Sequence, residues 1–215
     1  QQGISIMSDT LYYIHDPMCS WCWGYRPIWE RLQKNLPNSI VVEYVAGGLA
    51  PDSNSPMPVT QQQMIQNHWR TIEQKLGTEF NHDFWLKNTP RRSTYNACRA
   101  AIAAHKQACQ QSMIVAIQQG YYSRALNPSD LDMLIDLARE LSEKKSVTLE
   151  VDKFIVDIGS EETERELVRQ ITLAGKLSQQ GFPSLVLEVN ELFYQIPIDY
   201  ADYKHTLLDI TSRVK

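Results

Sequence analysis

Two cysteines, Cys19 and Cys22, lie where a strand-like segment of the chain gives way to a helical one. Residues 11–15 (LYYIH) are rich in side chains that favour strands. From 19 to 36 the apolar residues recur at helical spacing, and the apolar segment 39–46 is typical of a buried parallel strand. A strand, a helix and a strand of these lengths predict a βαβ unit. The chain is thereby constrained to an α/β fold with both cysteines at its first strand-to-helix junction.

A Cys-x-x-Cys pair in this position is a specific sign of redox chemistry. The first thiol faces the unpaired N–H groups and the positive dipole end of the helix, which stabilise a thiolate over a thiol. The second thiol is three residues further on, on the same helix face and close enough to form a disulfide with the first. Cys19 is therefore expected to attack a substrate disulfide, and Cys22 to resolve the mixed disulfide that results.

The middle of the chain, residues 60–157, has little strand signal and strong helical signal. The expected helices are 60–76, 93–120, 129–141 and 160–180, while 151–157 is ambiguous. The end returns to β structure, with strands at 185–189 and 192–196, a turn at Asn190-Glu191 and a last helix at 199–214. We therefore expect a discontinuous domain of residues 8–58 and 160–215, interrupted by an inserted helical domain, 59–159.

Two motifs carry a resemblance to a known family. The first is the segment 16–24 (DPMCSWCWG), followed by Pro27, five residues after Cys22. The second is the segment 181–184 (GFPS), directly before a predicted strand. Together they resemble the active-site helix and the cis-proline loop of the DsbA-like thioredoxin superfamily, in particular its FrnE-like branch of predicted disulfide isomerases. The 164 residues from Cys19 to Pro183 leave room for the helical insertion of such proteins.

This resemblance implies an α/β, thioredoxin-like fold with a large all-helical insertion, and the activity of a thiol–disulfide oxidoreductase. It implies that Cys19, Cys22 and Pro183 are the catalytic residues, with a cis Phe182–Pro183 bond packed against the two cysteines. Substrate would be bound by Ser20, Trp21 and Phe182. The partners would be protein or small-molecule thiols and disulfides, among them glutathione, and no cofactor or metal ion is expected.

Three aromatic residues near the motifs have two interpretations. Trp21, Trp23 and Phe182 could form an apolar surface around Cys19 that binds unfolded chains, or they could simply pack in the interior.

Position 13 departs from the pattern of the family. Many members carry a buried carboxylate six residues before the first cysteine, whereas this chain has Tyr13. His15 and Asp16 lie nearer to the motif and are candidates for proton transfer; alternatively, His15 ends a strand and Asp16 forms a turn. The pair Ser20-Trp21 also differs from those of the best-known oxidases and reductases, so the direction of catalysis stays open.

Two other functional classes are weighed against the oxidoreductase. A glutathione-dependent isomerase or transferase, of the kappa or 2-hydroxychromene-2-carboxylate isomerase type, would share the inserted fold but typically has a serine and no Cys-x-x-Cys. A non-catalytic zinc or chaperone module needs a second ligand pair, and Cys98 and Cys109 are eleven residues apart. If 93–110 is one helix, His105 and Cys109 share a face with Cys98. His105 and Cys109, four residues apart, could then share a metal ion, but free cysteines pack as small hydrophobic side chains, which favours packing over metal binding.

Charge and the remaining cysteines bear on partners and compartment. The chain has 21 basic and 25 acidic residues, a net charge of −4, which argues against a nucleic-acid binder with a basic face. No apolar stretch is long enough for a membrane span. Residues 1–6 do not resemble a signal peptide and Met7 resembles a native start, so we expect a cytoplasmic protein; a mature secreted protein is the alternative. Cys98 and Cys109 have no evident disulfide partner, which suits a reducing compartment.

Overall fold

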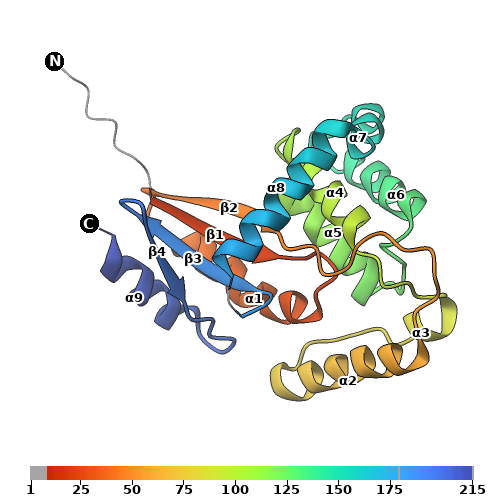
Figure 1. Ribbon diagram of the computed structural model, residues 1–215, viewed down its shortest axis with the longest axis horizontal. Helices are drawn as coiled ribbons and strands as arrows, with labels where there is room; N and C mark the ends of the chain where they lie inside the picture. The colour runs from red at the N-terminus through yellow and green to blue at the C-terminus, as the bar shows by residue number, and fades with distance from the viewer. Residues whose placement is uncertain (1–8, 179, 215) are drawn as a thin grey trace.

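A four-stranded mixed sheet is the centre of the computed structural model, which describes residues 9–178 and 180–214 (Figure 1). The predicted start at Met7 lies outside the described residues. The strands are β1 (Asp9–His15), β2 (Ile40–Ala46), β3 (Ser184–Val189) and β4 (Leu192–Ile196), in the order β2-β1-β3-β4. β1 pairs with β2 in parallel and with β3 antiparallel, and β3 pairs antiparallel with β4. The predicted βαβ unit is confirmed, with helix α1 (Ser20–Asn35) as its crossover.

Helices cover both faces of the sheet (Figure 1). Along β1, Leu11 and Tyr13 pack in one apolar cluster with α1 and α9 (Tyr203–Arg213). Ile14 faces the opposite side and packs with α8 (Glu161–Leu177). Successive side chains of a strand point to opposite faces, so a strand that is buried on both sides must be apolar at nearly every position. β1 meets this requirement from Leu11 to Ile14, and its C-terminal end leads into the cysteine motif.

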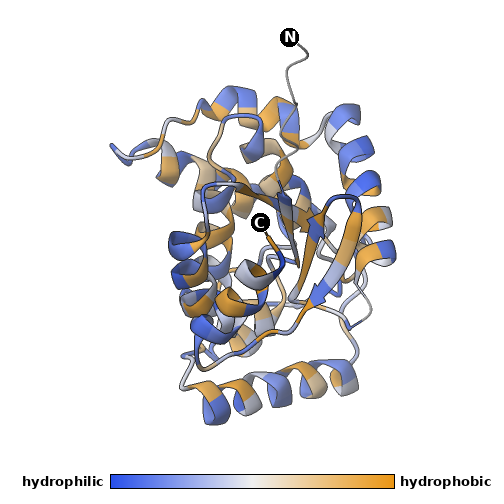
Figure 2. Ribbon diagram, turned by 90° about the vertical axis from the view of Figure 1, so that its left-hand side faces the viewer, coloured by the Kyte–Doolittle hydropathy of each residue, from blue (hydrophilic) through white to orange (hydrophobic). Residues whose placement is uncertain are grey.

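Six helices lie between β2 and α8, and together they confirm the predicted helical insertion. They are α2 (Val59–Leu76), α3 (Phe84–Lys87), α4 (Tyr95–His105), α5 (Gln110–Tyr122), α6 (Leu131–Ser142) and α7 (Val151–Ile158). Helices α4 to α7 share one apolar cluster, which includes Met113, Leu134 and Phe154. Helix α2, at the bottom of Figures 1 and 2, mixes hydrophilic and hydrophobic residues, and Trp69 anchors it in an aromatic cluster with Phe84 and Tyr122. The division of the chain into two domains stays a prediction.

The predicted single helix over 93–120 is wrong. Helix α4 ends at His105, a short turn follows, and α5 begins after Cys109. Ala108 in this turn has a φ of 57°, a left-handed conformation that interrupts the helix despite its alanine-rich sequence. The break lets α4 and α5 pack against each other. Since the single helix does not exist, the expected common face of Cys98, His105 and Cys109 is also wrong.

Several smaller expectations can be compared with the structure. The predicted hairpin is confirmed, because Asn190 and Glu191 both have a positive φ, as a two-residue type I′ turn requires. The ambiguous segment 151–157 is helical, as α7. Helix α2 begins one residue earlier than expected, at Val59, with Pro58 at its N-cap.

His15, the last residue of β1, supports a prediction about stability. It is buried between Tyr13, on which it stacks, and the edge of Tyr44, and this burial lowers its pKa from 6.5 to about 3. In the unfolded chain His15 takes up a proton near pH 6.5, whereas in the folded chain it does so only near pH 3. Its contribution to stability is therefore complete above pH 6.5 and is lost progressively as the pH falls toward 3.

We expect the free energy of unfolding of the His15→Phe variant to fall by about 2 kcal/mol less than that of the wild type between pH 7 and pH 5. Urea unfolding at the two pH values measures both differences. An equal loss in the two proteins would show that His15 is not the group that titrates.

Candidate active site

Cys19 is the N-cap residue of α1, at the end of the loop that follows β1. No side chain caps this helix end, so its first N–H groups lie unpaired beside the Cys19 thiol. The thiol donates to the carbonyl oxygen of Phe182 across a sulfur–oxygen distance of 3.6 Å. The predicted position of Cys19 at the positive end of a helix dipole is thereby confirmed.

Cys22 lies one helical turn behind Cys19 and is more deeply buried, with 1% of its surface exposed against 7% for Cys19. Burial, together with the adjacent Cys19 thiol, raises the pKa of Cys22 well above its usual range. Both thiols are free in this structure. Cys19 is thus the more accessible of the two thiols.

The loop before β3 brings Phe182 and Pro183 to Cys19. The predicted cis bond between Phe182 and Pro183 is confirmed. The ring of Phe182 lies directly over the backbone of Gly47, where a Cβ atom would collide with it. The Ser178 and Ser184 hydroxyls both donate to the carbonyl oxygen of Gly181, which braces this loop. Phe182 follows Cys19 by 163 residues, yet its contacts with Gly47 and the hydrogen bonds to Gly181 hold it against the cysteine motif.

Asp16, fully buried beneath the cysteine loop, joins three segments of the chain. Its Oδ1 accepts from the Met18 N–H at 2.8 Å, and its Oδ2 accepts from the Leu49 N–H at 2.9 Å and from the Thr94 hydroxyl at 2.7 Å. The Cys98 thiol also donates to Oδ2, at 3.5 Å. Burial raises the pKa of Asp16, and these donors act against that effect. These hydrogen bonds of Asp16 hold the loop that carries Cys19 in place.

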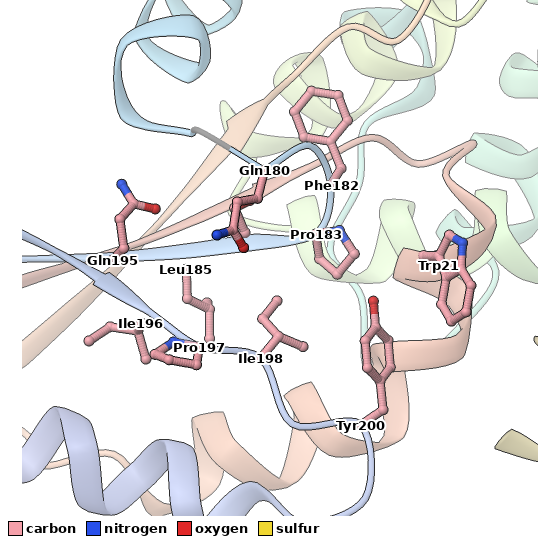
Figure 3. Close-up of a pocket in the computed structure, with 11 residues that line it drawn as sticks. Trp21, Gln180, Phe182, Pro183, Leu185, Gln195, Ile196, Pro197, Ile198 and Tyr200 are labelled. Carbon is pink, nitrogen blue, oxygen red and sulfur yellow. The ribbon is translucent and has the colours of Figure 1, made fainter. Parts of the chain in front are cut away.

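Two clefts flank Cys19, separated by Trp21 and Phe182, which line both. The first, here called the cis-proline cleft, has a volume of about 550 Å³ (Figure 3). Its lining is apolar or uncharged and includes Pro183, Leu185, Ile196, Ile198 and Tyr200. Figure 3 shows Trp21 and Tyr200 closing one end of it, and their rings meet edge to face at 5.5 Å.

The second cleft, here called the arginine cleft, has a volume of about 200 Å³ and is lined by Cys19 itself. Ser20 lies on its wall, together with three methionines and the cationic or basic side chains of His68, Arg91 and Arg92. No acidic residue lines it. Arg91 is paired with Asp130 at 2.5 Å, whereas Arg92 forms no ion pair within the described part of the chain. This cleft can accept an anionic group close to the Cys19 sulfur.

Trp23 does not join the surface around Cys19. Its ring stacks on Tyr122 at 5.6 Å and its Nε1 donates to the Glu79 carbonyl at 3.1 Å, so it packs toward the helical insertion. Sequence reasoning missed Thr94 and the role of Cys98, whose contacts with Asp16 cross 78 and 82 residues. No local pattern signals such partners.

The geometry and hydropathy of residues 9–178 and 180–214 bear on two further properties, metal binding and membrane insertion. No group of three or more Cys, His, Asp and Glu side chains in this part of the chain is arranged to hold a metal ion. No helix in it combines the length and the apolar character that crossing a membrane demands.

The chain is similar to a protein-family model and to several solved structures. A family model described as thioredoxin matches residues 12–205. A candidate protein disulfide isomerase from Nitrosomonas europaea is 25% identical, with a TM-score of 0.80 over 94% of this chain and 96% of that one. The cytosolic disulfide reductase DsbM from Pseudomonas aeruginosa is 21% identical, with a TM-score of 0.75 over 95% and 98% of the two chains. DsbM has also been solved with GSH, where the TM-score is 0.74 at 20% identity over the same shares of the chains.

A curated relative is the ClpXP adapter protein SpxH from Halalkalibacterium halodurans, 24% identical over 156 residues. The match covers 70% of this chain but spans only about half, 49%, of that protein.

Proposed function

Because this chain belongs to the thioredoxin family, we propose that it is a thiol–disulfide oxidoreductase of the DsbA type whose redox pair is Cys19 and Cys22. The observation that carries the proposal is the position of the Cys19 sulfur, at an uncapped helix start and 3.6 Å from the Phe182 carbonyl oxygen. Cys22 behind it is shielded from substrate and within reach of Cys19. A pair of this kind exchanges disulfides, whereas a single active-site serine, as in the related transferases and isomerases, cannot.

The reaction proceeds by two thiol–disulfide exchanges. The Cys19 thiolate attacks one sulfur of a substrate disulfide, a mixed disulfide forms, and the other substrate sulfur leaves as a thiolate. Cys22 then attacks the Cys19 sulfur, which breaks the mixed disulfide, forms the Cys19–Cys22 disulfide and releases the second substrate thiolate. Read in reverse, the same steps oxidise a dithiol.

Extended segments of protein substrates are proposed to bind in the cis-proline cleft. Its lining of Trp21, Phe182, Ile198 and Tyr200 offers apolar contacts without fixed charges, which suits side chains of varied sequence. Pro183 has no N–H group, so it presents no competing donor to a sulfur bound beside Cys19.

Glutathione is proposed as the small-molecule partner, bound in the arginine cleft. Its carboxylates would meet Arg92, and its sulfur would lie near Cys19 in the same cleft. That a protein of the same fold, DsbM, has been solved with GSH supports this choice.

We expect the Arg92→Gln variant to have a KM for glutathione disulfide about tenfold higher, because a charge-assisted hydrogen bond is lost, with little change in kcat. The difference should shrink at high salt, as a partly exposed ion pair does. Initial rates at low and high salt measure it. Arg165→Gln, an exposed arginine on α8 outside the cleft, is the matched control. Equal KM values for Arg92→Gln and wild type would show that glutathione does not bind in this cleft.

A redox titration of Cys19 and Cys22 against glutathione tests the function and decides its direction. A single two-electron transition with a potential near −270 mV, about that of thioredoxin, identifies a reductase, and one near −120 mV, about that of DsbA, identifies an oxidase. If the two thiols do not interconvert with a disulfide across this range, the proposed function is wrong.

A reducing compartment such as the cytoplasm is the proposed location. Cys98 and Cys109 are both buried with free thiols, one donating to Asp16 and the other to the Ala104 carbonyl. Such cysteines are common where no oxidising machinery operates. Fractionation of the native gene product tests this, and recovery from an oxidising compartment would contradict it.

A further inference from the structure

The Cys19 sulfur lies where the cis-proline cleft and the arginine cleft meet. Cys19 lines the arginine cleft, and its thiol is 3.6 Å from the carbonyl oxygen of Phe182, a residue that lines both clefts. Trp21, drawn with Phe182 in Figure 3, also lines both. A polypeptide whose cysteine reacts with Cys19 continues on both sides of that cysteine, so each side can lie in a different cleft.

The two clefts differ in charge. Among the described residues, no charged side chain lines the cis-proline cleft. The lining of the arginine cleft includes two arginines and a histidine but, within the same part of the chain, no acidic residue. An extended polypeptide that crosses Cys19 therefore passes from an uncharged cleft into a cationic one. A carboxylate is the side-chain group that complements the second cleft.

Arg92 is the cation that is free to bind such a carboxylate. It is half-buried in the wall of the arginine cleft, and its guanidinium forms no ion pair or hydrogen bond with residues 9–178 and 180–214. Its neighbour Arg91 is already paired with Asp130 at 2.5 Å. The charge of Arg92 acts on Tyr121, which lines the same cleft, and opposes the rise in the Tyr121 pKa that burial causes. A bound carboxylate would give this guanidinium the partner that it lacks.

The geometry of an extended chain determines where the carboxylate must stand in the substrate. Successive side chains of an extended segment point to opposite sides, and each residue advances the chain by about 3.3 Å. When the reacting cysteine points toward Cys19, its two direct neighbours therefore point away. The residues two positions before and after it point toward the protein, each about 7 Å from the cysteine. One of these two side chains can reach each cleft.

We propose that the protein acts on polypeptide disulfides in which an acidic residue stands two positions from the reacting cysteine, on one side only, where Arg92 binds its carboxylate. On the other side the corresponding residue is apolar and lies in the cis-proline cleft. The inference rests on the proposed function, in which Cys19 attacks a substrate disulfide. The Cys19 thiolate bonds to the sulfur of the peptide cysteine, the substrate disulfide breaks, and the other sulfur leaves with the electron pair as a thiolate.

The test uses short peptides, blocked at both ends, whose cysteine is joined through a disulfide to pyridine-2-thiol. Attack by Cys19 on the peptide sulfur releases pyridine-2-thione, which is uncharged and absorbs in the near ultraviolet, so no second anion competes for the cleft. In one pair of peptides, leucine stands two positions before the cysteine and either glutamate or glutamine two positions after it. In a second pair the order of the residues is reversed.

In one of the two orders, we expect the second-order rate constant of the wild type to be about tenfold higher for the glutamate peptide than for the glutamine peptide. The reason is the charge-assisted hydrogen bond that only glutamate can form with Arg92. In the other order the acidic side chain faces the uncharged cleft, and glutamate should give no advantage. High salt should reduce the advantage, because the ion pair is partly exposed.

Arg92→Gln should react with both peptides at the rate of the wild type with the glutamine peptide, so that only the advantage of glutamate is lost. Arg92→Glu should favour a peptide with lysine in place of glutamate, a reversal that a merely damaged site would not produce. Arg165→Gln, on α8 outside the cleft, is the matched control and should keep the wild-type preference.

Equal rates for glutamate and glutamine in both orders would overturn the proposal. An equal advantage of glutamate in both orders would also overturn it, since a general attraction for anions would then replace a single cleft. So would an advantage that persists in Arg92→Gln. If the wild type reacts with none of these peptides faster than Cys19→Ser does, the proposed function itself is wrong.

Discussion

Replacing Cys19 with serine is expected to reduce the rate of insulin-disulfide reduction to that of the uncatalysed reaction. A serine hydroxyl in the same place stays protonated at neutral pH and does not attack sulfur, whereas a cysteine thiolate is the nucleophile of thiol–disulfide exchange. The fold should be unaffected, because the two side chains differ by one atom. The measurement is the rate of insulin reduction with glutathione as the electron source.

Cys109→Ser provides the matched control. Cys109 is buried to the same degree as Cys19, with 7% of its surface exposed, but lies in the turn between α4 and α5. This variant should retain wild-type activity. Full activity of Cys19→Ser, or a comparable loss in Cys109→Ser, would assign the nucleophile to another residue.

Replacing Cys22 with serine is expected to leave the first exchange intact and to stop the second. Cys19 then attacks the substrate as before, but no thiol remains to resolve the mixed disulfide, so about one equivalent of substrate stays bound to the protein. Mass spectrometry under non-reducing conditions detects this adduct and locates it on Cys19. Steady-state turnover should fall to a small residual rate supported by free glutathione.

The double variant Cys19→Ser/Cys22→Ser should form no adduct under the same conditions. Multiple turnovers by Cys22→Ser at the wild-type rate would mean that substrate release does not depend on Cys22. The proposed role of Cys22 in resolving the mixed disulfide would then be wrong.

Much of the fold follows from short stretches of sequence. The alternation and the apolar runs of β1 and β2 mark a parallel pair, and the helix between them carries the cysteine motif at its start. The turn at Asn190-Glu191 and the break at Gly181 mark the hairpin. These features depend on neighbours a few residues apart, whose spacing decides whether one face of an element is apolar.

Local propensity failed where tertiary packing opposed it. The alanine-rich segment 93–120 favours one long helix, yet the chain turns at Ala108 so that α4 and α5 can pack side by side. A few tenths of a kcal/mol of helix propensity per residue is outweighed by the apolar surface that this packing buries.

The candidate site divides in the same way. Cys19 and Cys22 were evident from their spacing, and Pro183 from a motif that resembles a known loop, so these candidate residues could be proposed from the sequence alone. The Asp16 contacts with Leu49, Thr94 and Cys98 were not evident, nor was the meeting of Arg92 with Cys19 in one cleft. These neighbours lie on segments that meet only after the insertion has folded back against the sheet. Hydrogen bonding and burial act over a few ångströms in space whatever the separation along the chain, so only the tertiary structure could decide them.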